Sequence, residues 1–245
     1  MRAPLAVHGV VHLVRASGIQ ARDLAELRAG IAAATDASLF HHAHHPRLRH
    51  PFAPSPPPND FSAWVAGVMQ DRETAERLSF AVQTGGASAG ALRTALLAVL
   101  PQQAGRGSGA SRASESGPFT FLELDAVPVD LGLMAHDPDE LMLHLIDGNL
   151  SLYFHHVTER PWFAPAHETI AGWVRGRGEE RLAGWLEECA HDGRPLAESR
   201  RRLARRWLRS RVVHRLTESA GLPEGVRQSE ARRVVSGLVR RLKEG

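Results

Sequence analysis

The chain has 245 residues, of which 43% are hydrophobic, so it can bury one large or two small cores and is not disordered by composition. Its net charge is only +3, and its single cysteine, Cys189, excludes an internal disulfide and a cysteine-based zinc site. No apolar run approaches the roughly 18 residues that a membrane-spanning helix needs. We therefore expect a cytoplasmic protein without a membrane segment.

The first predicted elements are a short extended stretch at residues 10–14 and a helix that starts at Asp23. The Asp23 side chain can accept a hydrogen bond from the backbone N–H three residues on, and Glu26 can reach back, which is a capping box. Leu27 and Ile31 lie four residues apart, on one face of this helix.

A histidine-rich segment comes next, at residues 38–50. It holds five histidines: His41, His42, His44, His45 and His50. A proline-rich loop follows it. A tryptophan-bearing helix is then predicted to begin near Asp60, because aspartate is a favoured N-cap residue.

The second half of the chain shows a similar order of elements after a linker. Residues 101–118 are rich in Gly, Ser and Ala and have no apolar periodicity, which is typical of a flexible linker. An extended stretch is predicted at 119–124, followed by a helix capped by Asp137 with Pro138 in its first turn. A tryptophan-bearing helix is predicted to begin at Thr169.

Three short sequences recur in the same order in both halves, which indicates an internal duplication. The pairs are residues 21–27 with 135–141, residues 38–42 with 151–155, and residues 61–67 with 170–176. Their separations are 114, 113 and 109 residues, a drift that a shortened loop would give.

We therefore predict a mainly α-helical fold of two pseudo-repeated units, residues 1–100 and 119–216, with short extended segments. A C-terminal helical tail is predicted at 217–245, where an amphipathic stripe is formed by Ala231, Val234, Val235, Leu238, Val239 and Leu242.

This pattern resembles an uncharacterised bacterial family of duplicated helical proteins, a domain of unknown function. Members of that family carry approximately Tyr-Tyr-His-x-His, then a proline-rich loop, then Asn-Asp-Phe-x-x-Trp. Residues 40–44 and 59–64 match this outline, except that Phe40 and His41 replace the two tyrosines. The resemblance extends over about residues 8–215 and implies no established activity.

The clustered imidazoles are candidate ligands for a divalent transition metal ion. His41 and His45 share a face if the segment is helical, whereas His42 and His44 share one if it is extended. Either geometry supplies two ligands, and a stable site needs a third or fourth, for which Asp60 is the nearest carboxylate. The candidate metal ligands are His41, His42, His44 and His45, and the candidates for binding a ligand or metal are His42, His44, Asn59 and Asp60.

The second half of the chain lacks most of these groups. His155 is the only counterpart of a clustered histidine in the alignment above, where it corresponds to His42, and neither Asn59 nor Asp60 has a counterpart of its own type. A histidine present in both halves favours a packing role, and an aspartate after prolines is an ordinary helix start. We favour structural or surface histidines over a ligand site, and ligand binding over catalysis.

An arginine-rich helix is predicted at residues 194–215, which hold nine arginines and one acid, Glu198. Leu203 and Trp207 belong to an apolar stripe, so one side of this helix packs against the protein. Arginine suits contacts with carboxylates and phosphates. The candidate partner-binding residues are Arg201, Arg202, Arg205, Arg206 and Arg209.

The sequence specifies no reaction and no cofactor. We expect a non-catalytic protein that binds a partner or a small ligand through its first half, with a protein partner or a homo-oligomer favoured over nucleic acid because no nucleic-acid-binding fold is recognisable. The alternatives are a metal-dependent enzyme centred on His42, His44 and Asp60, and nucleic-acid binding by the arginine-rich helix.

Overall fold

The structure is a computed structural model that describes residues 3–52, 59–85, 88–101 and 117–218. Most of the predicted linker, and the predicted tail from residue 219 on, lie outside the described residues. None of the helices in these ranges combines the length and the apolar character that a membrane-spanning segment requires.

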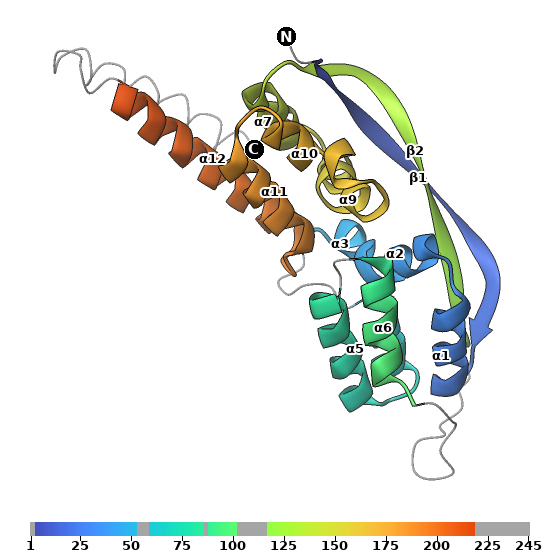
Figure 1. The fold of residues 1–245 in the computed structure, drawn as a ribbon. Coiled ribbons are helices and arrows are strands. Elements are labelled where there is room, and N and C mark those ends of the chain that lie inside the picture. Colours follow the sequence, from blue (N-terminus) through green and yellow to red (C-terminus); the bar gives the residue numbers. More distant parts are fainter. Residues whose placement is uncertain (1–2, 53–58, 86–87, 102–116, 219–245) are drawn as a thin grey trace.

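Two long antiparallel strands connect the two halves of the chain. Strand β1 (Leu5–Ala21) pairs with β2 (Phe119–Ala135), so that Val11 lies opposite Val127. The extended segments are therefore much longer than the short stretches predicted at 10–14 and 119–124. The helices lie on one side of this ribbon (Figure 1).

The first half forms a helical unit after β1. Its helices are α1 (Leu24–Ala33), α2 (Asp36–His44), α3 (Pro46–Arg49), α4 (Asp60–Gly67), α5 (Arg72–Gly85) and α6 (Ala89–Val99). The predicted start at Asp23 is confirmed, because its side chain accepts a hydrogen bond from the Glu26 N–H at 2.8 Å. The predicted cap of α4 is corrected by one residue, since Asn59 caps the helix and Asp60 is left to make other contacts.

The second half forms the other helical unit after β2. Its helices are α7 (Pro138–Asp147), α8 (Leu150–Phe154), the π-helix η1 (His155–Glu159), α9 (Arg160–Phe163), the 3₁₀ turn η2 (Ala166–Glu168), α10 (Ile170–Arg175), α11 (Glu180–His191) and α12 (Leu196–Glu218). The predicted caps Asp137 and Thr169 are confirmed by hydrogen bonds from backbone N–H groups. The wider π turn of η1 directly follows α8, and such turns are frequent at functional sites.

Each helical unit has its own hydrophobic core, and both strands contribute to both cores. Phe119 and Phe121 of β2 pack into the core of the first unit, whereas Val7 of β1 packs into that of the second. Phe40 of α2 also lies in the second core, and its ring centroid is 5.8 Å from that of Phe154. Helix α2 therefore lies at the seam between the two units.

Candidate functional site: histidines at the seam

Helix α2 distributes its histidines over two faces. His41 and His45 lie one turn apart with stacked rings, whose centroids are 5.0 Å apart, and the His42 ring lies 4.9 Å from that of His41. His44 lies on another face, where its ring contacts Phe40 and Trp162. The structure thus brings together three of the four predicted metal ligands and separates His44 from them.

His42 and Asp60, both predicted site residues, are hydrogen-bonded to each other. His42 Nδ1 lies 2.9 Å from Asp60 Oδ2, and Arg49 donates to both oxygens of the same carboxylate at 2.6 and 2.7 Å. Burial alone would raise the pKa of Asp60, but the hydrogen bonds from His42 and Arg49 lower it below its ordinary value. Asp60 therefore stays ionised and joins α2, α3 and α4.

The other nitrogen of His42 fixes the tautomer of its ring. The backbone N–H of Leu122 in β2 donates to His42 Nε2 at 2.8 Å, so the proton of the neutral imidazole is on Nδ1 and is donated to Asp60. A metal ion on Nδ1 would force that proton onto Nε2, where it would face the Leu122 N–H. His41, His42 and Asp60 offer ligand atoms within 4.8 Å of one another, but His42 is better suited to hold α2 in place than to bind a metal.

His41 and His45 are buried and lack hydrogen-bond partners at several nitrogens. Nδ1 of His41 and both nitrogens of His45 have no partner among the described residues. Burial, together with neighbouring histidines, lowers the pKa of His41 to about 3 and that of His45 to about 4. Both imidazoles are therefore neutral at pH 7 and keep a lone pair for a ligand.

His12 of β1 approaches this pair from the other side of the seam. Its ring centroid lies 5.1 Å from that of His45, and its Nε2 lies 3.0 and 3.1 Å from the two carboxylate oxygens of Glu159. Glu159 is 2% exposed and also binds His155 Nδ1 at 2.7 Å. Burial would raise the pKa of Glu159, but the hydrogen bonds to His12 and His155 lower it. A carboxylate that holds one nitrogen of an imidazole is typical support for a metal-binding histidine.

Neither His12 nor Glu159 was identified as a site residue from the sequence. They are 147 residues apart in the chain, and only the packing of η1 against β1 brings them together. One signal was available: His12 interrupts an apolar stretch in the sequence.

His156 occupies a comparable place in the second half. Its Nε2 lies 3.2 Å from the backbone nitrogen of His8 and 3.1 Å from the backbone oxygen of the same residue. Its Nδ1 has no partner among the described residues. Burial, followed by the charge of His155, lowers the pKa of His156 to about 4.

The arginine-rich helix is α12, and its predicted partner-binding residues separate into two groups. Arg202 and Arg206 pair with Glu188 of α11. Arg201, Arg205 and Arg209 are exposed and form no ion pair within the described part of the chain. The predicted apolar stripe packs as expected, since Leu203 and Trp207 are buried.

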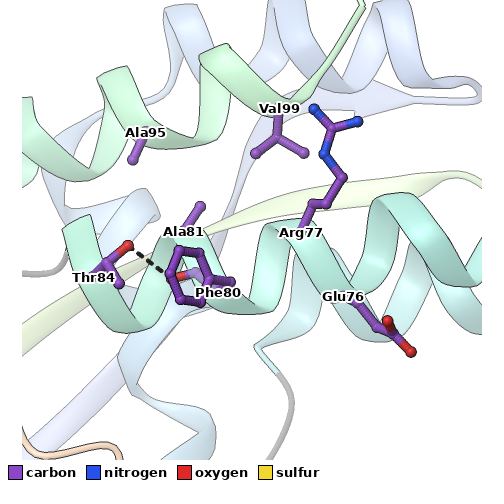
Figure 2. Close-up of a pocket in the computed structure, with 7 residues that line it drawn as sticks. All are labelled: Glu76, Arg77, Phe80, Ala81, Thr84, Ala95 and Val99. Atoms are coloured by element: carbon purple, nitrogen blue, oxygen red, sulfur yellow. Dashed lines mark hydrogen bonds between the residues drawn. The ribbon is translucent and has the colours of Figure 1, made fainter.

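Two cavities lie away from the histidine cluster. An open groove of about 460 Å³ runs between α5 and α6, where Phe80 is 66% exposed and Thr84 donates a hydrogen bond to the Phe80 carbonyl (Figure 2). A second cavity of about 380 Å³ lies in the second unit beside His156 and His191. Neither contains a predicted site residue.

Comparison with known proteins gives a family and a fold. A family model described as a family of unknown function, DUF5752, matches residues 2–207. The solved structure of OrfY from Thermoproteus tenax is similar, with a TM-score of 0.67 and 22% sequence identity over 84% of this chain and 95% of that chain. At this identity the likeness shows the fold alone. No curated protein matches the chain.

Proposed function

The chain belongs to the DUF5752 family of unknown function, and we propose that it binds a divalent transition metal ion through His12, His41 and His45. The observation that carries the proposal is the convergence of three imidazoles from β1 and α2, with unpartnered buried nitrogens on His41 and His45. Unsatisfied polar atoms are rare in protein interiors, and a missing ion is one of their ordinary causes.

The spacing of the rings fits a shared ion. With metal–nitrogen distances near 2.0–2.1 Å, the ring centres of two imidazoles on one tetrahedral ion lie roughly 5 Å apart. The separations here are 5.0 Å for His41 and His45 and 5.1 Å for His12 and His45. The His41 and His45 rings are stacked, so binding to one ion would require their rings to rotate.

The protonation of the cluster supports the same proposal. Metal binding requires neutral imidazoles, and the lowered pKa values of His41 and His45 supply them at neutral pH. Glu159 holds the Nε2 side of His12, which leaves Nδ1 of that ring for the ion. Three nitrogen ligands leave a fourth position for water or a small ligand, so the site would serve binding without requiring a reaction.

We further propose an internal duplication into units 1–100 and 119–216, which features that recur at one constant separation support. The helix caps recur at a separation of 114 residues, as Asp23 with Asp137 and Thr35 with Asn149. A contact between an imidazole and a strand backbone recurs at the same separation. His42 contacts Leu122 in the first unit, and His156 contacts His8 in the second, so that each residue lies 114 positions from its counterpart. This register makes His156 the counterpart of His42, whereas the sequence alignment paired His42 with His155.

The same comparison explains why the polar groups differ between the units. The caps Asn59 and Thr169 correspond, so Asp60 has Ile170 as its counterpart. His156 therefore lacks the carboxylate that His42 has, and its Nδ1 is left without a partner. At the same separation of 114 residues, His45 corresponds to Glu159. The first unit therefore supplies an imidazole at this position of the seam, and the second unit supplies a carboxylate.

The proposal is tested with tag-free protein that has been stripped with a chelator and then titrated with Co²⁺. We expect one equivalent to bind with the visible absorption of a tetrahedral ion, and Zn²⁺ to displace it. His12→Gln and His45→Gln should each lose this absorption, while circular dichroism confirms that both variants fold. His167→Gln is the matched control, because that side chain is 80% exposed and its ion pair is with the neighbouring Glu168.

Two results would overturn the proposal. The first is wild-type protein that binds no stoichiometric Co²⁺ or Zn²⁺. The second is binding that survives His12→Gln but is lost in Asp60→Asn, which would move the site to His41, His42 and Asp60.

A further inference from the structure

Helix α12 carries arginines that contact the protein on one side and arginines that are exposed on the other. On the side that faces the protein, Arg206 pairs with Glu188, and Arg211 pairs with Asp139 at 2.7 Å and with Glu179 at 2.9 Å. These contacts attach α12 to α11 and α7. Arg200, which is partly buried, donates to the Gly148 carbonyl oxygen at 2.6 Å, so each of these arginines has a partner within the protein.

The other side holds Arg201, Arg205 and Arg209, here called the exposed arginine row. All three side chains are exposed, and no ion pair or hydrogen bond joins any of them to another described residue. Residues four apart on an α-helix lie about 6 Å apart along its axis. The row therefore follows one exposed stripe of the helix, with one arginine about every turn.

The exposed arginine row has an energetic cost within the isolated chain. Like charges four residues apart on a helix repel each other. An opposing row of carboxylates would remove this repulsion, and each guanidinium can hold a carboxylate with two parallel hydrogen bonds.

We infer that the exposed arginine row of α12 docks an acidic helix of a partner protein. The partner would present glutamate or aspartate side chains at four-residue spacing, which matches the spacing of the arginines. Figure 1 shows α12 extending along one side of the molecule, opposite the β1–β2 ribbon.

The surroundings of the row favour a narrow acidic segment over a nucleic acid. Nucleic-acid sites are broad basic surfaces that contact many phosphates. Here Arg202 and Arg206 beside the row pair with Glu188, Arg194 pairs with Glu198, and Arg200 donates to the Gly148 carbonyl oxygen. A continuous phosphate backbone would approach these acids, whereas a single row of carboxylates would not.

The inference is tested by fluorescence anisotropy with a synthetic helical peptide that carries glutamate at every fourth position. We expect wild-type protein to bind it, with affinity that falls as salt is raised. Charge reversal of the row, Arg201→Glu/Arg205→Glu/Arg209→Glu, should weaken binding about tenfold or more. A peptide of the same composition with scrambled glutamate positions should bind more weakly than the regular one.

The matched control is Arg22→Glu/Arg72→Glu/Arg77→Glu, which changes the net charge equally at three exposed arginines elsewhere. The inference fails if this control loses as much affinity as the row variant, or if the row variant binds like wild type. It also fails if single-stranded DNA binds more tightly than the peptide and depends on the same three arginines, since the surface would then serve a nucleic acid.

Discussion

The backbone N–H of Leu122 in β2 donates a hydrogen bond to Nε2 of His42 in α2, across 80 residues of chain. This contact, with the bond from His42 to Asp60, satisfies both nitrogens of a buried imidazole. It also joins the first helical unit to the strand that leads into the second. His42 is therefore placed to hold the site together, while the unpartnered imidazoles beside it remain available.

Replacing His42 by alanine should lower the free energy of unfolding by about 1–3 kcal/mol, because the buried Leu122 N–H loses its acceptor and Asp60 loses a donor. Urea denaturation followed by circular dichroism measures this change. His50→Ala is the control, since His50 is exposed in the same segment and its loss should change stability little. Equal stabilities of the two variants would contradict the structural role of His42.

A second prediction concerns Arg47 of α3 and Asp192, whose ion pair joins the two units at 3.1 Å with both side chains 9% exposed. Arg47→Met leaves the Asp192 carboxyl buried without its partner, and should cost about 3–5 kcal/mol. The double variant Arg47→Met/Asp192→Leu should recover most of that loss, because no charge is then left buried.

The control for this pair is Arg175→Met. Arg175 pairs with Glu187 at 2.8 Å, but both side chains are exposed, so its loss should change stability little. If Arg47→Met proves no more costly than Arg175→Met, or if the double variant is as unstable as the single one, the buried pair does not contribute in this way.

The helix starts were predictable because they depend on a few neighbouring residues. A side-chain oxygen and an N–H two or three residues on suffice to form a cap, as at Asp23, Asp137 and Thr169. The prediction at Asp60 was wrong by one residue because Asn and Asp are equally good caps. The contacts of Asp60 with His42 and Arg49, which are 18 and 11 residues away in the chain, distinguish the two.

The strands and most of the site were not predictable, because they depend on contacts between distant segments. The ribbon is 17 residues long in each strand, but its middle is polar or exposed, as at Arg15 and Asp125, so no continuous apolar pattern marks it. His41 and His45 share a face of the helix because they are four residues apart, and that spacing could be read from the sequence. The approach of His12 and Glu159 depends on the packing of η1 against β1, which local sequence patterns do not reveal.

Glycines provide a third prediction, because two helical glycines differ in the space around them. A Cβ on Gly172 of α10 would lie 2.2 Å from the carbonyl oxygen of Ala166, so Gly172→Ala must displace backbone and should destabilise the protein by about 1–3 kcal/mol. A Cβ on Gly184 of α11 would meet no described atom within 4 Å. Gly184→Ala should therefore stabilise the protein by up to about 1 kcal/mol through helix propensity.

Thermal and urea unfolding of the two glycine variants measure this difference directly. Both substitutions add one methyl group to a helical glycine. Each therefore restricts the unfolded chain to the same extent, and this effect cancels when the two variants are compared. A Gly172→Ala variant as stable as Gly184→Ala would show that η2 can move away from α10 at little cost.

The last prediction is the pH dependence that His156 imposes. Its pKa is lowered from 6.5 to about 4 in the fold, first by burial and then by the charge of His155. Between these two values the unfolded chain binds a proton at this position that the folded chain does not, so stability must fall as the pH falls from 6.5 toward 4. One such proton lowers the free energy of unfolding by up to about 1.4 kcal/mol per pH unit.

His156→Gln removes this titration and keeps a side-chain oxygen that can accept from the His8 N–H, which the wild-type imidazole meets at 3.2 Å. Urea denaturation at a series of pH values should therefore give a shallower fall for the variant than for wild type, with the difference confined to the range from 6.5 to about 4. Parallel curves for the two proteins would mean that His156 takes up a proton in the folded state, and that its burial in the second unit is less complete than its 2% exposure indicates.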